Sequence, residues 1–137
     1  MAQADPSPIN LEQRRPLSPH LQIYRPMLTM MMSIAHRISG ASLAVGFLLL
    51  AWWLIAIAAG PEQYATVSHF FAGIPGRVLL FLFSWALLHH MLGGIRHFIW
   101  DSIHALDPVG RETIVRIQFA LSILLTLGAW AIFVWFR

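Results

Sequence analysis

The sequence contains no cysteine and no lysine, and charged residues of either sign are scarce. Without cysteine, the chain cannot form disulfides, bind zinc or iron–sulfur clusters through thiolates, or attach a c-type haem covalently. Charged residues make up 11% of the 137 residues and apolar residues 58%, whereas ordinary soluble domains have about 25% and about 45–50%. A single domain of this length cannot bury so much apolar surface in a soluble core. We therefore expect the bilayer to cover it.

The excess of positive charge is small. Nine arginines and six acidic residues give a net charge of +3, spread over a chain that is otherwise apolar. This distribution is more typical of membrane topology than of a nucleic-acid-binding surface. We therefore exclude nucleic acid as a partner and expect membrane lipid instead.

Three long apolar runs follow a polar N-terminal stretch, and each is near the ~20 residues that a helix needs to cross a bilayer. They predict an all-α membrane protein with three transmembrane helices, at about residues 33–59, 78–98 and 114–136. These helices would form one domain over residues 33–137. The first run begins too far along the chain for a cleavable signal peptide, so we expect it to stay attached.

Arginines are concentrated before the first apolar run and after the second, whereas only Arg77 lies in the connection between these two runs. The positive-inside rule therefore predicts a cytoplasmic N-terminus and a periplasmic C-terminus. The N-terminal residues lack the Arg- and Ser-rich, acid-poor composition of a mitochondrial transit peptide. This favours a bacterial inner membrane over the mitochondrial inner membrane.

The polar stretch before the first span is rich in proline. Because proline removes an N–H donor and fixes φ, we expect residues 1–32 to form an extended cytoplasmic arm. Its apolar residues, which include Leu17, Leu21 and Ile23, are too many for a solvated tail. We expect the arm to dock on a soluble partner.

Two connections link the predicted spans. Between Pro61 and Pro75, residues 63–72 are mildly amphipathic, and we expect them to lie at the membrane interface. The sequence DPVG at residues 107–110 is typical of a turn before the third span.

The second apolar run contains two adjacent histidines, His89 and His90. Ionisable groups inside a span are costly unless they face protein, water or a ligand. Neighbouring helix residues point about 100° apart, so we expect only one of the two to ligate a planar cofactor. His90 shares a helix face with Gly94 and His97, and a glycine there gives a flat macrocycle room to approach, which favours His90. The alternative is a neutral histidine that hydrogen-bonds a neighbouring helix.

A six-coordinate electron-transfer haem needs a second axial ligand. Neither of the other two spans has a histidine at membrane depth, because His36 lies at the very start of the first span and His69 and His104 fall in connections. If His90 binds haem, the second ligand must therefore come from a partner subunit. The haem would then lie at a subunit interface.

The entrance to the first span is polar, and Ser33, Arg37 and Gly40 share one helical face there. Arg37 is either a snorkelling topological anchor or a charged donor to a carboxylate or a quinone oxygen. In the second case the hydroxyl of Ser33, one turn away, would support it.

Polar residues in and near the third span have simpler interpretations. Gln118, Ser122 and Thr126 recur every four residues, which is typical of a hydrogen-bonding seam between helices. Asp101 follows the histidine helix and is either a proton-relay carboxylate or a charge that marks the helix end.

Three motifs occur in order before the third span: RPLSPHLQIY at residues 15–24, SIAHRISG at residues 33–40 and HMLGGIRH at residues 90–97. The ordered set closely resembles the cytochrome b membrane-anchor subunit of succinate dehydrogenase (respiratory complex II), over nearly the whole chain. The resemblance implies a subunit that binds haem b together with a second hydrophobic anchor subunit. It also implies a flavoprotein subunit and an iron–sulfur subunit that hold FAD and the iron–sulfur clusters, and ubiquinone as the substrate.

The resemblance also implies roles for single residues. By position, His90 matches the axial ligand of the haem iron, and His36 with Arg37 matches groups near the haem propionates. Ser33, Ile34 and Arg37 match residues that line the quinone pocket. The chain would thus be a non-flavin subunit of an enzyme that passes electrons from succinate to ubiquinone, with no complete active site of its own.

Two rival functions are left open by these motifs. The anchor of a quinol:fumarate reductase would share the haem and quinone chemistry but run in the opposite direction. A non-catalytic membrane-assembly or ion-transport subunit would use the arginines and histidines structurally.

Overall fold

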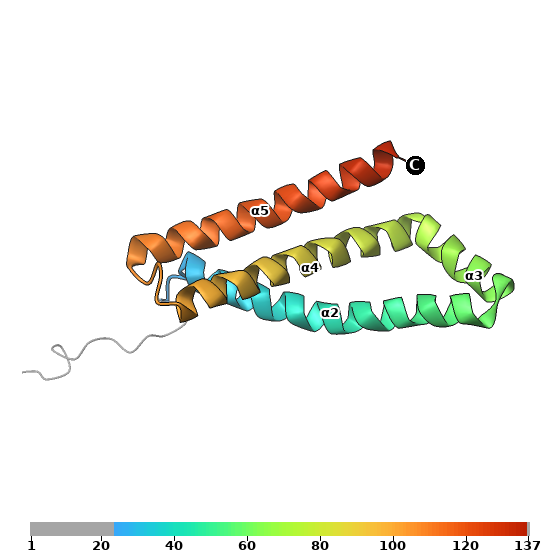
Figure 1. Ribbon diagram of the computed structural model, residues 1–137, viewed down its shortest axis with the longest axis horizontal. Helices are drawn as coiled ribbons and strands as arrows, with labels where there is room; N and C mark the ends of the chain where they lie inside the picture. The colour runs from blue at the N-terminus through green and yellow to red at the C-terminus, as the bar shows by residue number, and fades with distance from the viewer. Residues whose placement is uncertain (1–23, 137) are drawn as a thin grey trace, which may run out of the picture.

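The computed structural model describes residues 24–136, and all regular secondary structure in this range is helical. Four helices follow one another: α2 (Leu28–Ala59), α3 (Pro61–Ala72), α4 (Ile74–Asp101) and α5 (Pro108–Trp135) (Figure 1). The part of the predicted N-terminal arm before residue 24 lies outside the described residues.

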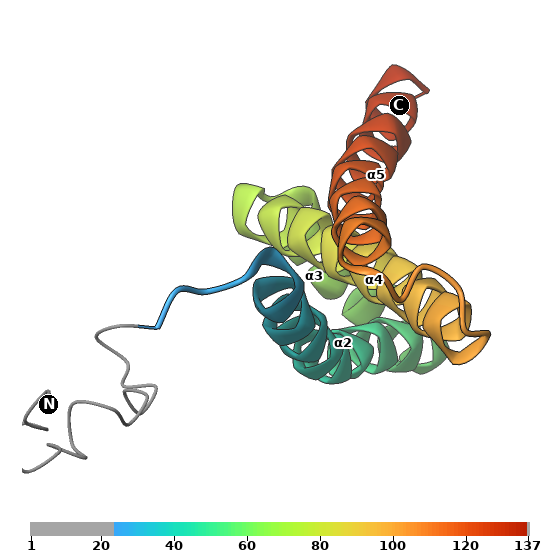
Figure 2. The ribbon, with the colours of Figure 1, turned by 90° about the vertical axis from the view of Figure 1, so that its left-hand side faces the viewer.

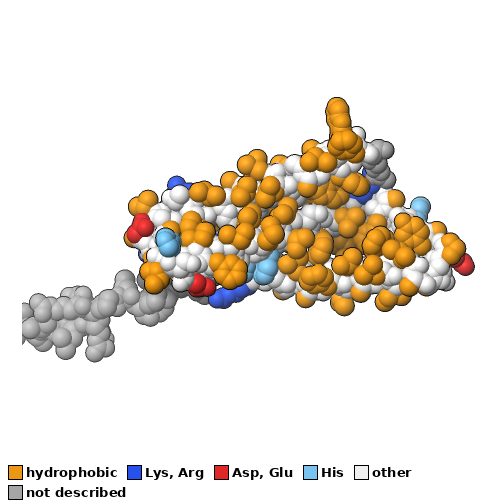
Figure 3. All heavy atoms as spheres, viewed as in Figure 1, with side chains coloured by type: hydrophobic (Ala, Val, Ile, Leu, Met, Phe, Trp, Pro, Cys, Tyr) orange, Lys and Arg blue, Asp and Glu red, His pale blue; other side chains and the backbone are white. Residues whose placement is uncertain are grey.

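α2, α4 and α5 are long and apolar enough to cross a membrane. α2 has 32 residues, and α4 and α5 have 28 each, so they measure about 48 Å and about 42 Å against about 30 Å of hydrocarbon. Many large apolar side chains along them are exposed. Figure 3 shows hydrophobic side chains over the middle of one face, with acidic side chains only towards its ends. The expectation of an all-α protein with three candidate spans is thereby confirmed for the described residues.

α2 begins earlier than the predicted first span. Met27 has an extended backbone (φ −85°, ψ 147°) and precedes the first helical residue, Leu28, whereas the predicted span starts at residue 33. The reason is local, because Pro26 is the last proline before the helix and no residue after it interrupts the hydrogen-bonding pattern. Ser33 and Ile34 therefore lie in the second turn of α2.

α2 and α4 run in opposite directions and are joined by α3 (Figure 1). α4 lies between α2 and α5 and packs against both, as the view along the bundle in Figure 2 shows. The start of α2, the end of α4 and the start of α5 therefore meet at one end of the bundle. The last turn of α5 lies at the opposite end (Figure 1).

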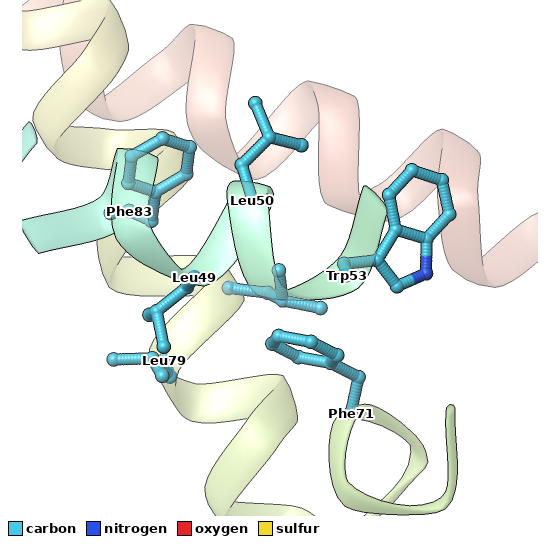
Figure 4. Close-up of a pocket in the computed structure, with 8 residues that line it drawn as sticks. Leu49, Leu50, Trp53, Phe71, Leu79 and Phe83 are labelled. Atoms are coloured by element: carbon cyan, nitrogen blue, oxygen red, sulfur yellow. The ribbon is translucent and has the colours of Figure 1, made fainter. Parts of the chain in front are cut away.

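α3 closes the end of the bundle that lies away from the start of α2. Pro61 occupies the beginning of this helix, where its missing N–H has no intrahelical partner to lose, and Val67 is buried against the neighbouring helices. The segment predicted at residues 63–72 is thus helical and contacts both α2 and α4. A cavity of about 360 Å³ lies between these three helices (Figure 4). It is lined by Gly46, Leu49, Leu50, Trp53, Phe71, Leu79, Leu80 and Phe83.

The turn predicted at residues 107–110 is wrong, because these residues begin α5. Asp107 is the N-cap, and its side chain accepts a hydrogen bond of 2.8 Å from the backbone N–H of Gly110. Pro108 follows at the first helical position, where its fixed φ suits the helix and no N–H is needed. An Asp-Pro pair suits a helix start as well as a turn, and the apolar run that follows extends it as a helix.

Candidate functional site

The imidazole rings of His36 on α2 and His90 on α4 stack against each other. Their centroids lie 4.1 Å apart and their planes are inclined by 5°. Each ring also lies over a glycine of the opposite helix. A Cβ at Gly40 would come within 2.9 Å of Cε1 of His90, and a Cβ at Gly93 would overlap the ring of His36. These two reciprocal contacts allow α2 and α4 to approach closely enough for the rings to stack.

The ring of His90 is held through its Nδ1 atom. This nitrogen lies 3.1 Å from the carbonyl oxygen of His36 and 3.3 Å from Oγ of Ser39. Ser39 is buried, and its hydroxyl donates a hydrogen bond of 2.8 Å to the same carbonyl. Within the described chain, Nε2 of His90 has no hydrogen-bond partner and is not fully buried. It is therefore the nitrogen available to a ligand.

His97 extends this pair into a histidine cluster, which consists of His36, His90 and His97. The ring centroids of His36 and His97 lie 5.4 Å apart, and their planes are inclined by 57°. Among the described residues, however, no group of three or more His, Asp or Glu side chains is arranged to hold a metal ion. Within the described residues, the cluster therefore offers single ligand atoms and does not form a metal site by itself.

The sequence pattern placed Gly94 beside the ligand as the residue that leaves room. A Cβ at Gly94 would meet nothing within 4 Å, so the surface there is open. The glycine that permits close helix packing is its neighbour Gly93, which sequence reasoning did not single out. The sequence shows two adjacent glycines, but which of them faces α2 depends on how α4 is rotated about its axis.

His89 points to a different neighbour from His90. It is fully buried, and its Nδ1 lies 3.4 Å from Oγ of Ser122 on α5. Gln118 donates a hydrogen bond of 3.3 Å from Nε2 to the carbonyl of His89, and Thr126 donates one of 2.7 Å to the carbonyl of Ser122. The seam predicted from these three residues of α5 therefore faces α4, and His89 completes it from the other side.

The residues expected to bind quinone surround His36 on α2: Ser33 and Ile34 lie within one turn before it, and Arg37 follows it directly. Ser33 is half-buried, while Ile34 and Arg37 are exposed on α2. Neither Ser33 nor Arg37 makes a side-chain hydrogen bond or ion pair within residues 24–136. Their polar atoms are therefore free to bind another molecule. Within the described residues, no hydrogen bond joins the side chain of Arg37 to His90.

Arg96 is a polar residue whose environment sequence reasoning missed. It lies near the end of α4, as expected from the sequence, but it is only 2% exposed, which the sequence did not indicate. Its guanidinium carbon lies 4.8 Å from the ring centroid of Trp100, a distance suited to a cation–π interaction. None of its three side-chain nitrogens has a hydrogen-bond partner in the described chain. Sequence alone could not show this, because the burial arises from the packing of the three helices.

The remaining candidates lie at the surface. Asp101 is the last residue of α4 and is exposed, which fits a helix-end charge. His104 is exposed in the connection between α4 and α5, and His69 is exposed on α3 rather than in a loop. None of the three contributes to the histidine cluster.

Comparison with known proteins adds an independent observation. Residues 12–133 match the family model described as succinate dehydrogenase/fumarate reductase transmembrane subunit. The succinate dehydrogenase cytochrome b556 subunit of Paracoccus denitrificans is 40% identical over 93 residues, covering 68% of this chain and 72% of the relative. That of Rickettsia bellii is 34% identical, covering 85% of this chain and 91% of the relative. The mitochondrial succinate dehydrogenase cytochrome B subunit of Schizosaccharomyces pombe is 37% identical, covering 80% of this chain and 64% of the relative.

These matches confirm the resemblance that the three ordered motifs indicated. The family match takes in the first two candidate spans and all but the last two residues of the third, and it includes the histidine cluster. The chain therefore belongs to the family of succinate dehydrogenase/fumarate reductase transmembrane subunits.

Proposed function

We propose that this chain is the haem b-binding membrane-anchor subunit of a succinate:quinone oxidoreductase. In this role it anchors the flavoprotein and iron–sulfur subunits and forms part of the site where ubiquinone is reduced. The observation that carries the proposal is the pairing of His36 with His90 between α2 and α4, in a chain whose relatives are named cytochrome b subunits.

The donor set around His90 fits a haem iron. Imidazole is one of the side-chain groups that ligate haem iron, and Nε2 of His90 has no hydrogen-bond partner in the described chain. His36 lies at the same depth, but its ring is stacked on that of His90 at 4.1 Å, so the two cannot bind opposite faces of one macrocycle. The second ligand of the iron would therefore come from the second hydrophobic anchor subunit. Haem b supplies a one-electron carrier at this subunit interface.

His36 and Arg37 would orient the haem by its propionates. Both lie in the first three turns of α2, at the end of the bundle where α4 ends. Arg37 is exposed, and its guanidinium can bind a carboxylate with two parallel hydrogen bonds. A charged partner at this end of the helix would keep the polar edge of the macrocycle towards the membrane surface.

Ser33, Ile34 and Arg37 would bind the quinone. A quinone gains negative charge as it accepts electrons, and a fixed guanidinium stabilises that charge more than it stabilises the neutral substrate. The hydroxyl of Ser33 can donate a hydrogen bond to a quinone carbonyl, and the exposed side chain of Ile34 provides apolar contact. The free polar atoms of Ser33 and Arg37 support this assignment.

The proposed orientation places the start of α2, and with it the histidine cluster, on the cytoplasmic side of a bacterial inner membrane. It rests on the arginine distribution. The arm formed by the residues before α2 would then lie on the side where the peripheral subunits dock. Relatives from bacteria and from a mitochondrion both match, so the bacterial location rests on composition alone.

A quinol:fumarate reductase anchor is the second candidate, because the matched family description includes fumarate reductases. The relatives named above favour succinate oxidation, since each is a succinate dehydrogenase subunit.

Spectra of two variants test the haem proposal. His90→Leu should abolish the haem b signal in the reduced-minus-oxidised spectrum of the assembled complex. His89→Leu should keep it, because His89 faces Ser122 on the other side of α4. The reverse pattern would mean that His89 is the ligand. An unchanged spectrum in both variants would remove the haem from this helix and favour a non-catalytic assembly subunit.

A further inference from the structure

The contacts around Nδ1 of His90 determine which of its ring nitrogens carries the proton. A backbone carbonyl can only accept hydrogen bonds, and the carbonyl of His36 lies 3.1 Å from Nδ1. The second neighbour, Oγ of Ser39, already donates its only proton to that same carbonyl at 2.8 Å. Both atoms facing Nδ1 are therefore acceptors.

A neutral imidazole has one donor nitrogen and one acceptor nitrogen. Because both neighbours of Nδ1 accept, the proton of His90 lies on Nδ1, and Nε2 keeps its lone pair. This is the form in which a histidine binds a metal, since ligating histidines typically donate the other ring N–H to a carbonyl or a similar partner. Ser39 is 4% exposed, so water does not compete readily for these contacts.

The plane and depth of the ring are fixed by other neighbours. The stack with His36 sets the plane of the His90 ring to within 5° of that of its neighbour. Gly40 sets the depth, because a Cβ there would come within 2.9 Å of Cε1 of His90. Ser39 differs from both, since it acts on the proton of the ring and not on its position alone.

We propose that Ser39 is a positioning residue for the haem ligand: together with the carbonyl of His36, it holds the proton of His90 on Nδ1 and so tunes the iron through Nε2. This inference rests on the proposed function, in which His90 binds the haem. A hydrogen bond accepted from Nδ1–H makes the imidazole a stronger electron donor and thereby favours oxidised iron. Hydrogen bonding of this kind sets haem reduction potentials.

The test is the reduction potential of haem b in membranes that contain the assembled complex. Ser39→Ala removes one of the two acceptors, so the potential should shift to a more positive value while the haem content stays near that of the wild type. Ser39→Thr keeps the hydroxyl and should restore the original potential. Ser39→Cys offers a weaker acceptor and should give an intermediate value.

Ser42→Ala is the matched control. Ser42 lies on the same helix and also donates to a backbone carbonyl, that of Ile38, at 2.9 Å, but it makes no hydrogen bond to His90. Its replacement should leave the potential unchanged. If Ser39→Ala assembles without haem, the Thr and Cys variants decide the question, and equal potentials in Cys and wild type overturn the proposal.

The failure of this inference is distinct from that of the haem proposal. If His90→Leu keeps its haem spectrum, the haem assignment itself fails. If His90→Leu loses the spectrum but Ser39→Ala keeps the wild-type potential, only the role of Ser39 is overturned. A shift of equal size in Ser42→Ala would also overturn it, because the effect would then be a general one of removing a hydroxyl from α2.

Discussion

His36 and His90 come from helices that run in opposite directions, yet their rings stack nearly parallel at 4.1 Å. The arrangement depends on small residues on both sides, since each ring fills the space above a glycine of the other helix. The pair is therefore sensitive to any side chain added at these glycines, and less sensitive to changes on the lipid-facing surface.

Gly93→Ala should lower the stability of the chain in detergent. Alanine gains up to about 1 kcal/mol over glycine in a helix, but overpacking costs about 1–3 kcal/mol, and the displaced ring of His36 would also lose its stack with His90. We expect a net loss, measured by thermal unfolding. Gly128→Ala is the matched control, because a Cβ there meets nothing within 4 Å and should stabilise the helix or leave it unchanged. Equal stabilisation by both substitutions would contradict the close packing at Gly93.

Removing the donors at the start of α2 should harm quinone reduction more than succinate oxidation. Ser33→Ala should reduce ubiquinone-dependent turnover by about 10²-fold, the usual cost of one preorganised donor, with dye-linked turnover retained. Arg37→Lys should retain only part of the ubiquinone-dependent turnover, because an ammonium lacks the planar fork of the guanidinium. Both activities are compared at equal haem and flavin content.

The control for this second prediction is Arg77→Lys. Arg77 is also exposed but lies in the first turn of α4, at the opposite end of the bundle, so neither activity should change. If both acceptors support equal turnover in Ser33→Ala and Arg37→Lys, the quinone does not bind to this part of α2, and Arg37 is a topological anchor.

Arg96→Met should stabilise the chain in detergent. The guanidinium is buried, and no hydrogen-bond partner lies within the described chain; a buried charge without a partner costs several kcal/mol. The cation–π contact with Trp100 returns only about 2 kcal/mol, and methionine fills a similar volume without the desolvation cost. We expect an increase in stability of about 1–4 kcal/mol, measured by thermal unfolding.

Arg116→Met serves as the comparison for Arg96. Arg116 is exposed and forms an ion pair of 2.8 Å with Glu112, and such surface pairs contribute about 0–1 kcal/mol. Its replacement should change the stability little. A marked loss of stability in Arg96→Met would contradict this prediction and show that the contact with Trp100 outweighs the desolvation cost of the guanidinium.

The three spans were predictable because hydropathy and length depend on composition alone, and the seam on α5 followed from its four-residue spacing. The start of α5 could not be predicted, because Asp107 and Pro108 suit both a turn and a capped helix. The environments of Gly93 and Arg96 could not be predicted from the sequence either. Each depends on how far one helix is rotated against its neighbours, which is decided by packing across all three helices and leaves no local pattern.

Three crossings have a consequence for how the protein is tagged. The start of α2 and the end of α5 lie at opposite ends of the bundle (Figure 1). If all three candidate spans cross the membrane, these two ends face different compartments. A reporter enzyme that works in only one compartment would be active when fused after α5 and silent when fused before α2, or the reverse. The histidine cluster lies near the start of α2, so a bulky label is better placed after α5 than before α2.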